Sequence, residues 1–188
     1  MSLSDHVTIK SGRTFKSGIK EHPAPTHKVI QLRDVEEDID WERLVSVNIE
    51  TTHSVKTLMS DQILMIAKGP VKQAVLINNP PLDNAVATQH FLVITVKNPE
   101  ALLPEFLMFY LNSEPVQHWL NGNSGGSYQS TLSISNLSKL PFPILSIDQQ
   151  RLILEGVQSV KKEISLHECL IAERQRQLND IAGALLTK

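Results

Sequence analysis

Basic side chains gather near the amino terminus, and their chemistry is suited to binding phosphate. Residues 1–33 hold six lysines and arginines against two acidic residues, which gives this segment a charge of +4. Residues 34–61 hold eight acids against two basic residues, although the whole chain carries only −2. A basic segment beside an acidic one favours an edge that faces phosphates, whereas a solvated surface with balanced charges is an equally weighted alternative. The predicted phosphate contacts are Lys10, Arg13, Lys16 and Arg33.

A polar loop later in the chain offers hydrogen-bonding groups of a different kind. The stretch NGNSGGSYQST at residues 121–131 has glycines that permit close backbone approach, and polar side chains suited to a base edge or a phosphate. It lacks the Gly-Lys-Ser/Thr ending of a nucleotide-binding loop. A plain loop without a ligand is an equal alternative. The predicted base contacts are Ser127, Tyr128 and Gln129.

One motif imitates an enzyme. The stretch INNPPLD contains Asn79-Pro80-Pro81, which resembles the tetrapeptide with which adenine amino-methyltransferases hold their target amine. Leu82 stands where that family places an aromatic residue against the flipped base, and no glycine-rich loop for the methyl donor follows an early strand. The chain also has no metal-binding His-Glu-x-x-His pair and no Gly-x-Ser-x-Gly turn. We therefore predict no catalytic residue, no metal and no cofactor.

Composition favours a folded chain in a reducing compartment. Its 188 residues are 41% hydrophobic, enough to bury a sizeable core. The apolar runs are far shorter than the roughly 18 residues that cross a membrane, so we expect no membrane contact. The one cysteine, Cys169, excludes an internal disulfide and disfavours a zinc site built on thiolates. A cytoplasmic location fits these features.

The elements that must position the candidate side chains are short up to about residue 145. Segments rich in Val, Ile, Leu and Phe predict strands at residues 29–32, 62–67, 73–77 and 91–96. Two short helices are expected between residues 104 and 121, the second opened by Ser113 and ended at Gly122. This mixture predicts an α/β (α+β) globular domain over residues 1–145.

A long helix is expected to follow. In the stretch LPFP two prolines, Pro141 and Pro143, hold the chain extended, and Ser146 with Gln149 forms the pattern of a capping box at a helix start. Good helix formers then continue without a proline for about 57 Å at 1.5 Å per residue. A domain of about 145 residues has a radius of gyration of roughly 15 Å, so such a helix would extend past its own core. We place this second segment at residues 146–188.

Apolar residues along this helix recur at alternate steps of four and three. Eight of the ten positions are apolar, and a period of about 3.5 residues over about four heptads is typical of a coiled-coil seam. An amphipathic helix folded back on its own domain is the alternative. Leu152 and Leu166 lie on a flank of the helix and either pack on the first domain or dock another subunit. The seam positions are Ile153, Val157, Val160, Ile164, His167, Ile171, Arg174, Leu178, Ile181 and Leu185.

Taken together, these segments resemble half of a type I restriction-modification specificity subunit. Near the start, VTIKSGRTFKSGI and HKVIQLRDV are similar to the family's opening strand, glycine turn and following strand. The stretch LMSDQILMIAKG resembles its Leu-x-x-Gly-Asp-Ile-Leu segment, with Ser60 in place of the usual glycine. The most specific match is the order of LPEFLMFYLNS, a polar glycine loop, and LSISNLSKLPFPILSIDQQRLI, which is similar to the close of each half of those subunits.

The resemblance implies that residues 1–145 are a target recognition domain that reads double-stranded DNA and that residues 146–188 are a spacer helix. It also implies no catalysis by this chain, since methylation belongs to partner methyltransferase (modification) subunits and cleavage to the restriction subunit that acts with them. The chain would direct those partners to a bipartite site. A full subunit has two domains and two antiparallel helices, so this chain is either a natural half-subunit or a fragment of a longer one.

From the single helix we predict an antiparallel homodimer of two chains. The midpoint of the seam lies near residue 169, which places His167 near the two-fold axis, opposite the Ile171 region of its mate. Arg174 would then approach Glu163 of the mate. Polar residues in an apolar seam lower stability but restrict register. A coiled-coil dimerisation adaptor whose globular part binds protein is the alternative function, and an adenine methyltransferase fragment comes third.

Overall fold

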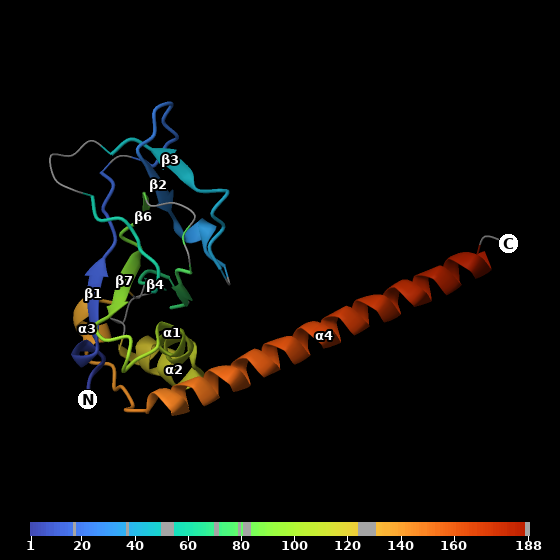
Figure 1. Cartoon of the computed structure of the whole chain (residues 1–188). Helices are drawn as coiled ribbons and strands as arrows, with labels where there is room; N and C mark the ends of the chain where they lie inside the picture. Colours follow the sequence, from blue (N-terminus) through green and yellow to red (C-terminus); the bar gives the residue numbers. More distant parts are fainter. Residues whose placement is uncertain are drawn as a thin grey trace. The chain divides into compact units, whose positions relative to one another are not determined.

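The chain divides into two compact units, Met1–Ile147 and Asp148–Lys188. Their computed structural model describes residues 1–16, 18–36, 38–49, 55–69, 72–78, 80, 84–123 and 131–186 (Figure 1). The first is called the globular unit below. Mixed sheets followed by one long helix confirm the predicted fold class.

A four-stranded antiparallel sheet forms the centre of the globular unit. Its strands lie in the order β1, β7, β4, β5, and their residues are Val7–Ser11, Phe91–Val96, Gln62–Ile66 and Ala74–Leu76. Lys10 pairs with Val93, which pairs with Leu64 on the other side. Branched and aromatic residues dominate β4 and β7 because such side chains pack well on a pleated, buried surface. Lys10, Val93 and Leu64 therefore share one face of the sheet.

A second sheet has three short strands. Its order is β3, β2, β6, with bounds Val45–Val47, His27–Ile30 and Ala85–Ala87. The strand predicted at residues 29–32 is β2, which begins two residues earlier and ends at Ile30. It ends there because Leu32–Asp34 turns into a 3-10 helix, in which the Asp34 carboxylate accepts the Gln31 backbone N–H at 2.8 Å. A similar 3-10 turn, Leu3–Asp5, precedes β1.

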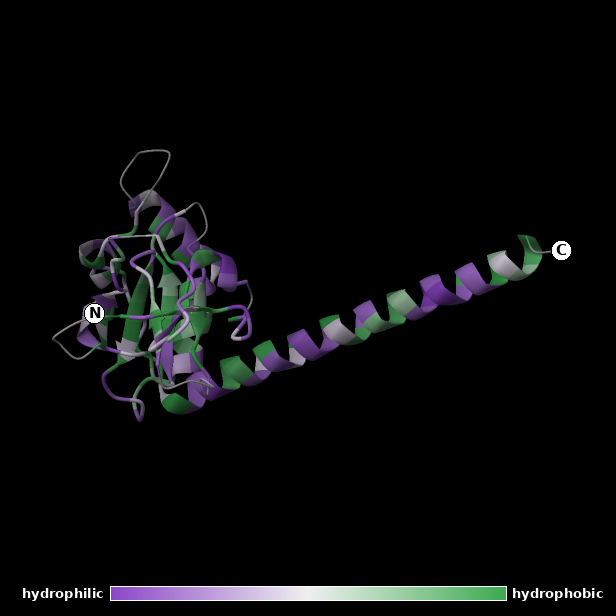
Figure 2. Cartoon of the chain, turned by 90° about the horizontal axis from the view of Figure 1, so that it is seen from above, coloured by the Kyte–Doolittle hydropathy of each residue, from purple (hydrophilic) through white to green (hydrophobic). Residues whose placement is uncertain are grey.

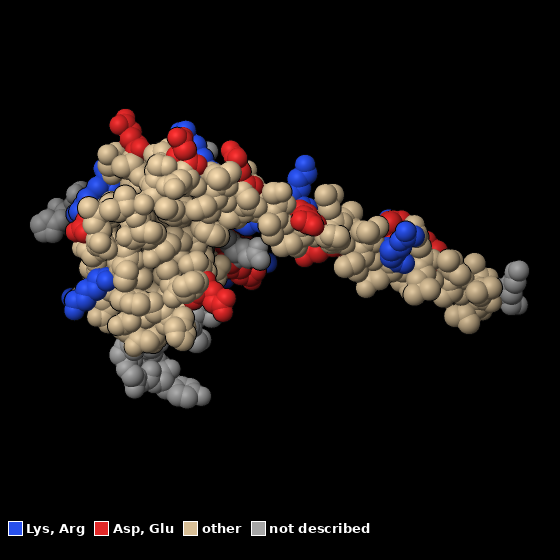
Figure 3. All heavy atoms as spheres, turned by 90° about the horizontal axis from the view of Figure 1, so that it is seen from below, with Lys and Arg blue, Asp and Glu red and all other residues tan. Residues whose placement is uncertain are grey.

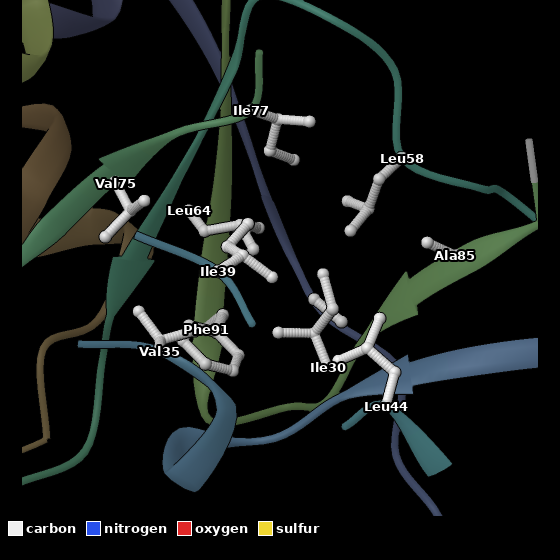
Figure 4. Close-up of a cluster of buried hydrophobic side chains, with 11 residues drawn as sticks. Ile30, Val35, Ile39, Leu44, Leu58, Leu64, Val75, Ile77, Ala85 and Phe91 are labelled. Carbon is white, nitrogen blue, oxygen red and sulfur yellow. The ribbon is translucent and has the colours of Figure 1, made fainter. Parts of the chain in front are cut away.

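Both sheets contribute to one hydrophobic core. Figure 4 shows Ile30 from β2, Leu64 from β4 and Phe91 from β7 around the same apolar interior. Phe91 and Ile30 are completely buried, and burial of side chains of this size stabilises a fold by about 1.5–3 kcal/mol each. The remaining members are Val35, Ile39, Leu44, Leu58, Val75, Ile77, Ala85 and Ala87.

Three short helices complete the globular unit. Helix α1 (Pro104–Asn112) packs on β4 and β5, α2 (Glu114–Asn123) packs on α1, and α3 (Ile134–Ser138) packs on β1. The Asn112 side chain bonds both the N–H and the C=O of Ala74, at 2.8 and 2.7 Å, and so secures the edge strand β5. The two helices predicted after residue 104 are confirmed, although α2 continues through Gly122. Nothing predicted α3, which starts at a Ser133 cap whose side chain accepts the Asn136 N–H.

The proline segment is bound to the start of the chain. Leu3 N–H donates to the Leu140 carbonyl at 2.9 Å, and Phe142 N–H donates to the Met1 carbonyl at 3.2 Å. The Phe142 ring also lies 5.2 Å from the Tyr110 ring, edge to face. The globular unit therefore holds the chain as far as Phe142.

Helix α4 (Ile147–Leu186) begins directly after Ser146, as the sequence pattern predicts, and its 40 residues span about 60 Å. The capping box itself stays a prediction. Among the described residues, no helix combines the length and the apolar character that crossing a membrane requires.

Candidate nucleic-acid interface

A close backbone approach places Arg13. Gly12 N–H donates to the Phe91 carbonyl at 3.0 Å, and Arg13 N–H donates to the Ala87 carbonyl at 2.8 Å. An added Cβ on Gly12 would lie 2.1 Å from the Thr88 carbonyl oxygen, so only glycine fits here. Arg13 in turn accepts a hydrogen bond from Gln89 N–H at 2.8 Å through its own carbonyl. The backbone of Arg13 is thus tied to the turn that joins β6 to β7.

Lys10 and Arg13 line a hollow of about 600 Å³ between the two sheets. One wall is the face of the four-stranded sheet that carries Val93 and Thr95, and another is β6. Residues 55–59 form a further wall, which Leu58 N–H joins to the Ala85 carbonyl of β6 at 2.8 Å. Lys56 comes from that segment, and no sequence signal singled it out.

The basic residues of the hollow are not neutralised by partners in the described part of the chain. No ion pair there involves Lys10, Arg13 or Lys56. The charge of Arg13 also reaches His27: burial of the imidazole lowers its pKa first, and the nearby Arg13 guanidinium lowers it further. On the face drawn in Figure 3, lysines and arginines are interspersed with acids. Positive charge is therefore concentrated locally in a protein of mixed surface charge.

The other predicted contacts are placed differently. Lys16 is exposed and Arg33 is exposed, and neither lines the hollow. The Arg33 Nε lies 3.6 Å from a carboxylate oxygen of the buried Asp34, so part of its charge is already matched. Ser127, Tyr128 and Gln129 lie outside the described residues. Of the seven residues predicted to contact DNA, the structure places Lys10 and Arg13 at one hollow, which Lys56 also lines.

Lys72 is a buried cation that the sequence did not reveal. Its side chain is completely buried, and its ammonium group donates to the carbonyls of Ala67 and Gly69, at 3.2 and 2.6 Å. The Gly69 backbone has φ of +123°, a conformation that only glycine adopts readily. Burial lowers the Lys72 pKa from its ordinary 10.5, because the charged form loses its hydration.

We expect Lys72 to make the unfolding free energy depend on pH in the alkaline range. Between its lowered native pKa and 10.5 the unfolded chain binds more protons than the native one, so the contribution of Lys72 to the unfolding free energy rises with pH. Lys72→Met keeps the stem and removes the titration. Urea unfolding measures this effect between about pH 8 and about pH 10. As pH rises, the unfolding free energy of the parent should increase relative to that of Lys72→Met. A constant difference would contradict the assignment.

Helix α4 presents an apolar stripe in the single chain. The apolar seam residues from Val160 onward are between 52 and 70% exposed, and green residues recur along α4 in Figure 2. His167 lies 3.8 Å from Glu163 on its own helix, and Arg174 donates to Gln177 at 3.1 Å. The polar seam residues therefore have intrachain partners, which a mate would have to compete with. Their roles across a two-fold axis stay predictions.

Other side chains of α4 and the rest of the described chain do not form a metal site. Cys169 is exposed, and the described residues contain no group of three His, Cys, Asp or Glu side chains suited to hold an ion. Leu152 and Leu166 are 69 and 63% exposed. The described residues thus present a basic hollow in the globular unit and an exposed apolar stripe on α4.

Comparisons with known proteins relate this arrangement to a family. Residues 1–174 match the model of the type I restriction modification DNA specificity domain. The specificity subunit of the type I restriction enzyme EcoBI from Escherichia coli is 23% identical over 185 residues. That alignment covers 96% of this chain and 36% of the relative, so the chain spans about a third of that protein's length.

Solved structures share the fold. The S subunit of a type I restriction-modification system from M. genitalium superimposes with a TM-score of 0.56 at 16% identity, over 86% of this chain and 38% of that one. The HsdS subunit from Thermoanaerobacter tengcongensis superimposes with a TM-score of 0.63 at 14% identity, over 88% of this chain and 37% of that one. Each relative is therefore more than twice as long as the part that this chain matches.

Proposed function

The chain belongs to the type I restriction-modification DNA specificity domain family, and from that premise we propose that it recognises a DNA sequence for partner subunits. The observation that carries the proposal is the family match over residues 1–174, which includes the whole globular unit and most of α4. In this role the globular unit reads double-stranded DNA, methyltransferase subunits and with them the restriction subunit supply the chemistry, and the chain itself performs no catalysis. The role requires a cytoplasmic location, where the DNA is.

The proposal assigns functions to the two segments. Residues 1–145 form the target recognition domain, and residues 146–188 form a spacer helix that pairs with a second copy. The chain covers 36 to 38% of the relatives described above, which is near the share expected of one domain and one helix out of two. Two chains pairing antiparallel would then restore two recognition domains for a bipartite site. The exposed seam of α4 supports this pairing because apolar residues at this period need a partner helix.

The alternatives have less support. A coiled-coil adaptor that binds protein would need no concentration of unmatched basic side chains, whereas Lys10, Arg13 and Lys56 line one hollow. An adenine methyltransferase fragment rests on Asn79-Pro80-Pro81, of which only Pro80 lies within the described residues. Family membership favours neither alternative.

Selection from a randomised duplex pool tests the function directly. The full chain, alone and together with a family methyltransferase subunit, should enrich one bipartite sequence. Binding without enrichment would leave only a nonspecific affinity for DNA, and enrichment of no duplex in either condition would overturn the proposal. Substitutions at Ser127, Tyr128 or Gln129 should change which sequence is enriched.

Removing one phosphate contact should weaken all DNA sequences alike. In Lys10→Gln or Arg13→Gln, the negative slope of log K against log salt should become shallower by about 0.9, because one fewer counterion is released on binding. Lys16→Gln and Arg33→Gln should behave likewise, with a smaller change for Arg33 since Asp34 already shares its charge.

The matched control for these variants is Lys162→Gln, which removes the same charge from an exposed position on α4. Fluorescence anisotropy with a labelled duplex at several salt concentrations gives the slope for the parent chain, for each variant and for the control. An unchanged slope in Arg13→Gln, or an equal change in Lys162→Gln, would remove the hollow from the DNA interface.

A further inference from the structure

The hollow between the sheets has the size of a ligand pocket and is larger than a flat surface that contacts a phosphate would require. Its volume of about 600 Å³ is within the range of small-molecule sites, roughly 300–1,000 Å³. A phosphate lying against a surface needs no such volume. Something larger than a single phosphate fits here.

The lining favours an anion with an apolar part. Lys10, Arg13 and Lys56 are the charged residues of the hollow, and its described lining includes no Asp or Glu. Apolar side chains form much of the remaining wall, among them Leu58, Val86, Ala87 and Val93. A cation would be repelled by this lining, and a bare inorganic anion would leave the apolar wall uncovered.

Polar groups stand beside the apolar wall in a defined arrangement. The Gln62 side chain is almost completely buried, donates from Nε2 to the Thr95 hydroxyl at 3.2 Å and accepts the Met59 N–H at 3.0 Å. Because Thr95 accepts in this bond, its own hydroxyl hydrogen can donate to a ligand, as far as the described neighbours show. Gln62 therefore orients a donor at the edge of the apolar wall, where a ligand's polar edge would meet it.

We propose that this hollow binds one nucleotide unit, with its phosphate among Lys10, Arg13 and Lys56 and its base on the apolar wall near Thr95. The inference rests on the proposed function for its choice of ligand. Two sources share this chemistry: a nucleotide displaced from the stack of the bound DNA, and a free mononucleotide. In the first case the globular unit reads DNA by taking in one nucleotide as well as by contacting the backbone.

Calorimetry with the full chain tests the ligand class. Titration with dAMP and dTMP should show binding about tenfold tighter than with inorganic phosphate or with the matching nucleosides, since each of those lacks one half of the contacts. Equal affinity for inorganic phosphate would overturn the proposal in favour of a simple anion site. No heat change at about 1 mM mononucleotide would also overturn it.

Two variants separate the pocket from general surface charge. Lys10→Gln/Lys56→Gln removes two cations without adding volume and should weaken mononucleotide binding about tenfold or more. Val93→Phe enlarges a side chain of the apolar wall, so that it occupies space in the hollow, and should abolish binding while all three cations remain. Circular dichroism checks that this variant is folded. Lys162→Gln should bind as the parent does. Retained affinity in both hollow variants would overturn the assignment.

Competition identifies the source of the nucleotide. A duplex with one unpaired, bulged nucleotide should displace labelled mononucleotide more strongly than the fully paired duplex if DNA supplies the ligand; if neither duplex competes, the ligand is the free mononucleotide. Failure here is distinguishable from failure of the proposed function. A chain that enriches a DNA sequence but binds no mononucleotide loses only the pocket, and one that binds mononucleotide but enriches no sequence loses only the DNA role.

Discussion

The double substitution Ile164→Glu/Leu178→Glu should convert the proposed dimer into monomers. These side chains are 52 and 67% exposed in the single chain, and pairing would remove most of that apolar surface from water. In a two-fold antiparallel seam each substitution occurs twice, so four carboxylates would enter the apolar contact, at several kcal/mol in total. We expect the dimer dissociation constant to rise about a thousandfold or more. Analytical ultracentrifugation at micromolar concentration measures the change.

Leu166→Glu is the matched control, because Leu166 is equally apolar, 63% exposed and on the same helix but away from the seam. It should leave the dimer intact. A parent chain that is monomeric at micromolar concentration would overturn the pairing, and a dimer that survives both seam glutamates would place the contact elsewhere.

Cross-linking decides the orientation of the two helices. In a Cys169→Ser background, a mixture of Ile153→Cys and Leu185→Cys chains should form disulfide-linked pairs only between unlike chains if the helices are antiparallel. Efficient linkage of Ile153→Cys chains to one another would indicate a parallel pair instead, since disulfides form only between Cα atoms about 4.4–6.8 Å apart.

Gly12→Ala should give the largest loss of stability among conservative substitutions. The added Cβ would lie 2.1 Å from the Thr88 carbonyl oxygen and 2.8 Å from that of Ala87. Neither carbonyl is free to move away, because Ala87 O accepts Arg13 N–H and Thr88 O accepts Phe91 N–H. The strands must separate at this point, so we expect a loss of about 3 kcal/mol in unfolding free energy. Urea denaturation measures it.

Gly18→Ala provides the control, because a Cβ there meets no atom of the described residues within 4 Å. Its unfolding free energy should change by less than about 0.5 kcal/mol. Equal stability of the two variants would show that the backbone relaxes around Gly12 at little cost. Loss of stability in Gly12→Ala should also weaken mononucleotide and DNA binding, since Arg13 follows directly in the chain.

Local sequence pattern was enough to predict the long helix and the two central strands, whose residue types follow a clear pattern along the chain. The long helix follows from a run of good helix formers with a regular apolar period, and α4 occupies residues 147–186. Strands β4 and β7 follow from dense branched and aromatic residues. Strand β6 gave no such signal, because Ala85 and Ala87 have little strand propensity and form β6 by pairing with β2. Strand β3 holds two valines but is only three residues long, too short a run to indicate a strand by itself.

The family and the basic character of the first segment were likewise readable from the sequence, because motif order and charge are properties of the chain itself. The grouping of basic residues in the hollow was decided only by the tertiary structure. Lys10 and Arg13 are more than forty residues from Lys56, and the three line one hollow because β1 pairs with β7 while Leu58 N–H bonds the carbonyl of Ala85 in β6. Pairing between distant segments depends on which backbone groups satisfy one another, and no local pattern encodes that choice.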